Sequence, residues 1–170
     1  QHLRDARITT IYEGTTGIQA ADLVGRKTLR DGGAAANELL VEIDETIAGL
    51  TANDARVVDI RAALEGAVSD VRSVLDWLMA AQSEDPRLPA AASGHYLKLW
   101  GVLCGGWQMA FAAQICAEKL AEGQADQMFC DSKIATAHFF ATQVIPQTSS
   151  LKATIEHGSE SVLFLDAANF

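Results

Sequence analysis

Residues 54–82 read DARVVDIRAALEGAVSDVRSVLDWLMAAQ, and their apolar side chains recur every three or four positions. The recurring positions are Val57, Ile60, Leu64, Val68, Val71, Leu75 and Leu78. This spacing gives one apolar stripe along an α-helix, because the helix completes a turn every 3.6 residues. We therefore expect an amphipathic helix that packs one face on a core, with Asp54 as the cap of its first turn.

The same period runs through four further segments, and no run alternates apolar and polar residues as a β-strand would. We expect helices over residues 16–29, 34–50, 94–122 and 126–156. Pro146 lies inside the last of these and should kink it, because proline cannot donate the helical hydrogen bond. The sequence thus predicts an all-α fold, an antiparallel four-helix bundle preceded by a loop and a helix.

Residues 99–117 carry no charge and are numerous enough to raise the question of a membrane span. Gln108 and Gln114 interrupt this stretch, and the neighbouring helices have apolar faces that need a partner. We therefore expect a buried central helix and no membrane span. Gly101 and Gly105 have the spacing G-x-x-x-G, which should let another helix approach closely.

Two segments fall outside the expected helices. Residues 83–93 contain Pro86 and Pro89, which favour a loop. Residues 162–165 form a short apolar tail that we expect to dock against the bundle.

Length and charge exclude some classes of protein. A chain of 170 residues can form one domain with a sizeable core. A formal net charge of -9 argues against nucleic-acid or anionic-membrane partners, which are held by clustered lysine and arginine. The first residue is Gln and not Met, so we expect the sequence to be part of a longer protein.

The cysteines and histidines do not form a recognisable metal or disulfide pattern. Cys104, Cys116 and Cys130 are odd in number and lack a C-x-x-C pair, so neither a disulfide framework nor a zinc site is predicted. Reduced cysteines favour a reducing compartment, and we expect the cytoplasm. The four histidines are scattered without metal-ligand spacing, so no metal site is predicted.

Glu13 is the first candidate for chemistry. It lies between Tyr12 and Gly14 and follows a stretch rich in β-branched residues. Such a setting would exclude water and raise the pKa of the carboxyl group, as a general base near neutral pH requires. The alternative is an ordinary solvated glutamate that favours the helix dipole.

Thr16 and Gln19 suggest how the following helix begins. A threonine with glutamine three residues later is a capping box, and the helix N-terminus that it opens presents N–H groups suited to phosphate oxygens. The alternative is a cap with a purely structural role. Gly14 and Gly17 could likewise be ordinary turn residues.

The N-terminal residues carry a motif. RDAR at residues 4–7, IYEGT at 11–15 and IQ at 18–19 closely resemble the C-terminal motif of acyl-CoA dehydrogenases, without a gap. The rest of the chain resembles the additional helical C-terminal domain of larger bacterial members. The resemblance implies that residues 1–32 end the catalytic helical domain and that residues 33–170 form the additional domain.

The resemblance also implies roles for individual residues. Glu13 would be the catalytic base that removes the α-proton of an acyl-CoA thioester, with FAD as hydride acceptor and trans-2-enoyl-CoA as product. The main-chain N–H of Glu13 and a flavin hydroxyl would hold the thioester carbonyl. Gly14 would let the substrate pass close to the backbone. Thr15, Thr16 and Gly17 align with positions that contact FAD.

Partners follow from the same resemblance. They are an acyl-CoA substrate, an electron-transferring flavoprotein as electron acceptor, and further copies of the chain in a homodimer or homotetramer. The flavin of this family lies between three domains, so we expect the chain alone to be inactive. The alternative is a non-catalytic helical module that serves oligomer contacts or shields the mouth of an active site.

Overall fold

The structure, a computed structural model, describes residues 1–10, 15–124, 126–165 and 167–169 and contains no strand in these ranges. The predicted all-α class is confirmed. The first helices are α1 (His2–Ala6), η1 (Arg7–Thr10), α2 (Thr16–Asp22), the π-helical η2 (Leu23–Thr28) and η3 (Leu29–Asp31). The longer helices are α3 (Ala34–Gly49), α4 (Ala55–Glu84), α5 (Arg87–Ala121), α6 (Gln127–Gln143) and α7 (Gln147–Gly158). The last described elements are the short η4 (Glu160–Leu163) and η5 (Ala167–Asn169).

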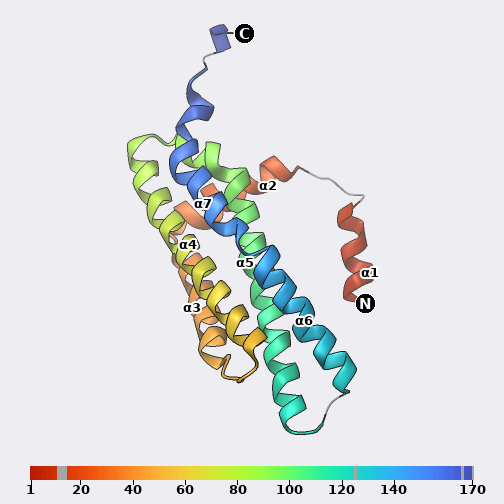
Figure 1. Ribbon diagram of the computed structural model, residues 1–170. Helices are drawn as coiled ribbons and strands as arrows, with labels where there is room; N and C mark the ends of the chain where they lie inside the picture. Colours follow the sequence, from red (N-terminus) through yellow and green to blue (C-terminus); the bar gives the residue numbers. More distant parts are fainter. Residues whose placement is uncertain (11–14, 125, 166, 170) are drawn as a thin grey trace.

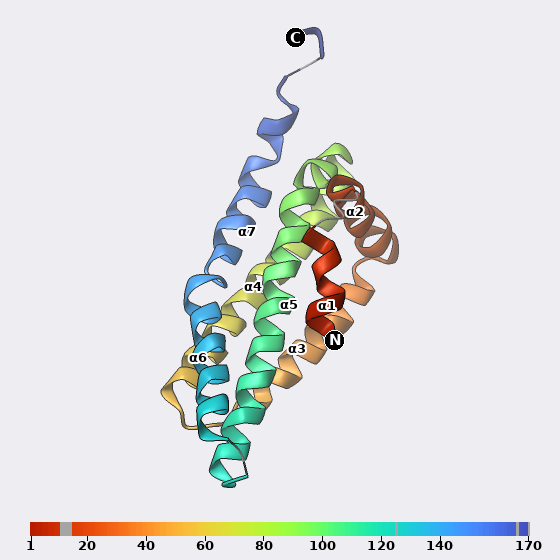
Figure 2. The same ribbon diagram turned by 90° about the vertical axis from the view of Figure 1, so that its right-hand side faces the viewer.

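The central element is α5, which contacts α2, α3, α4, α6 and α7. From α3 to α6, successive helices run in opposite directions, so the predicted antiparallel arrangement is visible in Figure 1. Figures 1 and 2 show α6 and α7 following one another along one side of α5. The segment formed by α2 and η2, called the rod below, packs on α5 as well, which fixes residues 16–28 to the bundle.

The predicted stripe of α4 forms much of the core. All seven of its residues are at most 4% exposed. Asp54 caps the helix as expected, since its side chain accepts a hydrogen bond from the backbone N–H of Arg56. From α5, Tyr96, Leu99 and Leu103 are fully buried, so the helix that contains the uncharged stretch is a buried central helix, as expected.

Glycines let α5 approach the α6–α7 side closely. A Cβ at Gly105 would lie 2.9 Å from the ring of Phe140, and one at Gly106 would lie 2.7 Å from Ile145. Gly101 faces open space, with nothing within 4 Å. The close approach expected from G-x-x-x-G is therefore confirmed at Gly105 but wrong at Gly101. The second glycine at which a neighbouring segment comes close is Gly106.

The loop predicted for residues 83–93 is wrong. Only Asp85 and Pro86 separate α4 from α5, which begins at Arg87. Pro89 lies within the first turn of α5, where a backbone N–H has no acceptor in its own helix, so proline is tolerated there.

The two remaining expectations for the C-terminal part have opposite outcomes. The predicted kink is confirmed as a full break, because α6 ends at Gln143 and Pro146 is the N-cap of α7. The apolar tail does not dock as a whole: Val162 is 64% and Phe164 77% exposed, and only Leu163 is half-buried.

Among the described residues, no helix has both the length and the apolar character needed to cross a membrane.

Candidate functional site

Three of the five predicted site residues, Thr15, Thr16 and Gly17, lie at the start of α2. The other two, Glu13 and Gly14, lie outside the described residues. Thr15, Thr16 and Gly17 stand side by side at the first turn of α2, and all three are exposed. A Cβ added at Gly17 would meet nothing within 4 Å, so the backbone here is open to an approaching molecule.

Thr15 has an unusual backbone conformation. Its φ of 81° and ψ of 45° lie in the left-handed region, and it is the only non-glycine residue with a positive φ in the described part of the chain. A β-branched residue pays about 1–3 kcal/mol for such a conformation, and residues of this kind cluster where ligands bind. The strain therefore falls at the residues that sequence reasoning assigned to FAD.

The predicted capping box at Thr16 is wrong. The N-cap is Thr15, whose side chain makes no capping hydrogen bond, and the backbone N–H of Gln19 bonds to the carbonyl oxygen of Thr15 at 2.9 Å. The positive φ of Thr15 turns the chain into the helix one residue earlier than the sequence pattern indicated.

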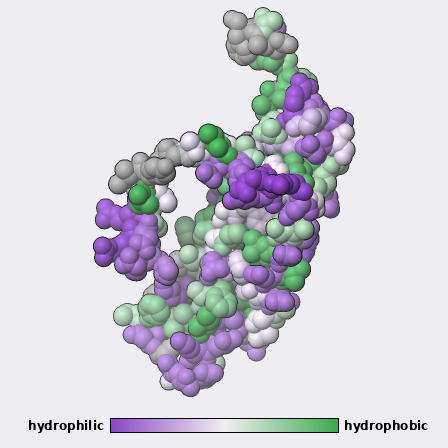
Figure 3. All heavy atoms as spheres, turned by 180° about the vertical axis from the view of Figure 1, so that it is seen from behind, coloured by the Kyte–Doolittle hydropathy of each residue, from purple (hydrophilic) through white to green (hydrophobic). Residues whose placement is uncertain are grey.

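The rod of α2 and η2 holds this turn against the bundle. Ala20 and Val24 are buried, at 0% and 2% exposure. The hydroxyl of Thr28 donates to the carbonyl oxygen of Leu23 at 2.9 Å and lies 3.0 Å from the hydroxyl of Tyr96 on α5. Figure 3 shows the N-terminal residues as a hydrophilic lobe separated from the body by an open space. The exposed turn thus stands on a fixed helix beside that space.

Charges on the outer side of this rod are paired. Arg26 donates to both carboxylate oxygens of Asp22, at 2.6 and 2.9 Å. This hydrogen bonding lowers the pKa of Asp22. Lys27 lies farther away, with its ammonium nitrogen 3.8 Å from Asp22.

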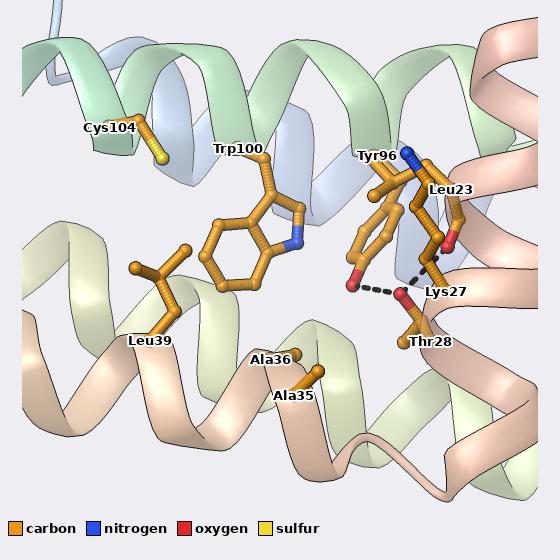
Figure 4. Close-up of a pocket in the computed structure, with 9 residues that line it drawn as sticks. All are labelled: Leu23, Lys27, Thr28, Ala35, Ala36, Leu39, Tyr96, Trp100 and Cys104. Atoms are coloured by element: carbon orange, nitrogen blue, oxygen red, sulfur yellow. Dashed lines mark hydrogen bonds between the residues drawn. The ribbon is translucent and has the colours of Figure 1, made fainter.

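A pocket of about 280 Å³ lies next to the rod, between η2, α3 and α5 (Figure 4). Its apolar lining consists of Leu23, Ala35, Ala36, Leu39, Trp100 and Cys104. Residues 15–17 do not line it. Burial raises the pKa of the Cys104 thiol, so the thiol is neutral and belongs to the apolar lining.

Sequence reasoning missed the polar pair at one end of this pocket. Burial raises the pKa of Tyr96, so its hydroxyl remains protonated. Because the proton of Thr28 is directed at Leu23, the Tyr96 hydroxyl donates to Thr28. Tyr96 lies on the same helical face as Leu99 and Leu103, and this position was the available signal, since a buried hydroxyl needs a partner.

Comparison with known proteins identifies the bundle. Residues 39–166, most of the chain, match the family model described as acetyl-CoA dehydrogenase C-terminal like. The match covers α4 to α7 and most of α3.

Individual relatives extend the likeness over the N-terminal residues. The chain is 41% identical over 163 residues to 3-methylmercaptopropionyl-CoA dehydrogenase of Ruegeria pomeroyi, an alignment of 96% of this chain and 28% of the relative. It is 34% identical over 178 residues to the broad-specificity linear acyl-CoA dehydrogenase FadE5 of Mycobacterium tuberculosis, with 100% of this chain and 29% of the relative aligned. A butyryl-CoA dehydrogenase of Syntrophomonas wolfei is 32% identical over 84% of this chain and 24% of its own length. The chain thus spans less than a third of these relatives, and it belongs to the acyl-CoA dehydrogenase family, in its C-terminal part.

Proposed function

We propose that the chain is the C-terminal part of a flavin-dependent acyl-CoA dehydrogenase. The observation that carries this proposal is the uninterrupted motif of residues 4–19, which stands directly before a bundle that matches the family. Residues 1–32 complete the catalytic helical domain, and residues 33–170 form an additional helical domain. The relatives are named as dehydrogenases of acyl-CoA thioesters, which supports this substrate class.

Glu13 is the base of the proposed reaction. Its carboxylate removes the proton from the α-carbon of the thioester, while its backbone N–H donates to the thioester carbonyl and stabilises the enolate-like charge. Gly14 leaves room for the thioester beside the backbone. The chemistry that FAD supplies when bound is acceptance of the β-hydrogen as a hydride, which leaves trans-2-enoyl-CoA.

Thr15, Thr16 and Gly17 fit a role in holding FAD. They are exposed at a helix N-terminus, which carries partial positive charge and favours phosphate oxygens. The open space at Gly17 leaves its backbone accessible. The strained turn at Thr15 is held in place by the rod behind it, as expected of a residue that positions a ligand.

The outer face of α6 supports a further role in assembly. Met128, Phe129 and Phe139 are 78%, 57% and 63% exposed, so α6 presents three large apolar side chains to solvent. Such a face suits contacts within a homodimer or homotetramer. It also favours the second candidate function, a module for oligomer contacts or for shielding an active site.

An electron-transferring flavoprotein is the electron acceptor we propose.

The test compares Glu13→Gln with wild type in the full-length protein. We expect the variant to retain FAD but to lose bleaching of the flavin by an acyl-CoA, because the amide cannot accept the α-proton. Glu38→Gln makes the same change on the exposed face of α3 and should bleach normally. Undiminished bleaching in Glu13→Gln would show that Glu13 is not the base and would favour the second candidate function. The isolated chain with added FAD should not oxidise acyl-CoA.

A further inference from the structure

The pocket between η2, α3 and α5 is small and apolar (Figure 4). The indole ring of Trp100 on α5 stands opposite Ala35 and Ala36 on α3, and these short side chains leave the space unfilled. At about 280 Å³, the pocket lies just below the range of drug-sized binding sites. Its lining therefore suits a slim apolar group such as an alkyl chain.

The polar groups of the pocket comprise a satisfied pair and an unsatisfied donor. The hydroxyls of Thr28 and Tyr96 satisfy one another and the carbonyl of Leu23. The indole N–H of Trp100 is buried, in a residue that is only 8% exposed; it interacts with the Tyr96 hydroxyl but makes no hydrogen bond of normal geometry among the described residues. Figure 4 places this nitrogen on the side of the ring that faces Tyr96 and Lys27. The pocket thus offers this N–H no acceptor in good geometry.

Lys27 adds a positive charge on the same side. Its side chain lines the pocket and extends beside the Tyr96 ring in Figure 4. It is 53% exposed and lies 3.8 Å from Asp22, whose two oxygens are already held by Arg26. The ammonium group is thus only weakly engaged. A carboxylate at this end of the pocket would complement the charge of Lys27.

We propose that this pocket binds an alkyl carboxylate of short to medium chain length, with the chain packed on Trp100 and the carboxylate beside Lys27. This ligand is additional to the acyl-CoA and FAD of the proposed function. Its binding does not depend on Glu13 or on residues 15–17.

Cys104 provides a direct reporter, because its thiol lines the pocket and is half-buried. The full-length protein is treated with N-ethylmaleimide at increasing concentrations of octanoate, and labelling of the Cys104 peptide is followed by mass spectrometry. Octanoate should slow the labelling to a saturable limit. Because each buried methylene strengthens binding about fourfold, hexanoate should bind about fifteenfold more weakly.

Two pairs of variants distinguish the contribution of the pocket's volume to octanoate binding from the contribution of the Lys27 charge. Ala36→Phe fills the pocket and should abolish protection by octanoate, while Ala48→Phe, on the exposed side of the same helix, should leave it intact. Lys27→Gln should weaken octanoate about threefold to fivefold and leave protection by uncharged octanol unchanged, since a half-exposed charge pair contributes little more. Lys98→Gln removes a charge outside the pocket and should change neither.

Several results would overturn the proposal. The first is an absence of protection at millimolar octanoate, and the second is full protection in Ala36→Phe. Equal octanoate affinity in Lys27→Gln and wild type would remove the anionic part of the assignment. A Cys104 that reacts only after denaturation would show that another segment of the protein fills the pocket. None of these readouts measures flavin bleaching. The proposed function can therefore fail while this proposal holds, or the reverse.

Discussion

Thr15 combines a β-branched side chain with a left-handed backbone, at φ 81°. Glycine adopts this conformation without a steric penalty from Cβ. We therefore expect Thr15→Gly to raise the free energy of unfolding by about 1 kcal/mol, measured by urea denaturation. If the strained turn positions FAD, the same change should weaken FAD binding in the full-length protein. Thr16→Gly is the control: Thr16 is already helical, so this change should not stabilise. Equal effects of the two changes would contradict strain at Thr15.

Within α5, two glycines with different surroundings predict opposite effects of the same substitution. Gly101→Ala adds a methyl group into open space and should stabilise the helix by up to about 1 kcal/mol. Gly106→Ala gains the same helix propensity, but its Cβ would lie 2.7 Å from the Ile145 side chain, so Ile145 or α5 must shift. Overpacking of this kind costs about 1–3 kcal/mol. Thermal unfolding should therefore rank Gly101→Ala above wild type and Gly106→Ala below it; the same shift in both variants would mean that Ile145 moves aside freely.

The elements also show where sequence reasoning succeeds and where it stops. The predicted stripe from Val57 to Leu78 is buried throughout. This prediction succeeded because the helical period of the apolar residues can be read from the local sequence alone. The start of α5 was missed because Pro89 can either break a helix or occupy its first turn, and the neighbouring sequence does not distinguish these roles. The pocket could not be predicted at all, since its Thr28–Tyr96 contact joins residues 68 positions apart.

For the whole molecule, charge governs stability in two opposing ways as pH falls. The net charge of -9 at pH 7 implies self-repulsion, which declines toward the pI of about 4.8. Below that point a second effect takes over. The pKa of Asp54 is lowered, chiefly because Arg56 donates hydrogen bonds to it, and those of Asp22 and Asp85 are lowered by neighbouring arginines in the same way. A carboxyl group with a depressed pKa in the folded state stabilises fully above its unfolded pKa of about 3.9, and this contribution is lost as pH falls through the folded value.

Asp54 allows the second effect to be isolated. It caps α4 and holds Arg56, whose guanidinium also donates to Asp131 on α6 at 3.3 Å. Loss of such a cap costs about 1 kcal/mol. We expect Asp54→Ala to lower the free energy of unfolding by this amount at pH 7 and by progressively less below pH 4, where the wild-type carboxylate is protonated too. Urea titrations across this range measure the difference, with Glu38→Ala as a surface control that should show no such convergence. A penalty that stayed constant down to the lowest pH would mean that the charge of Asp54 does not contribute, and that the acid sensitivity of the fold arises from its other carboxylates.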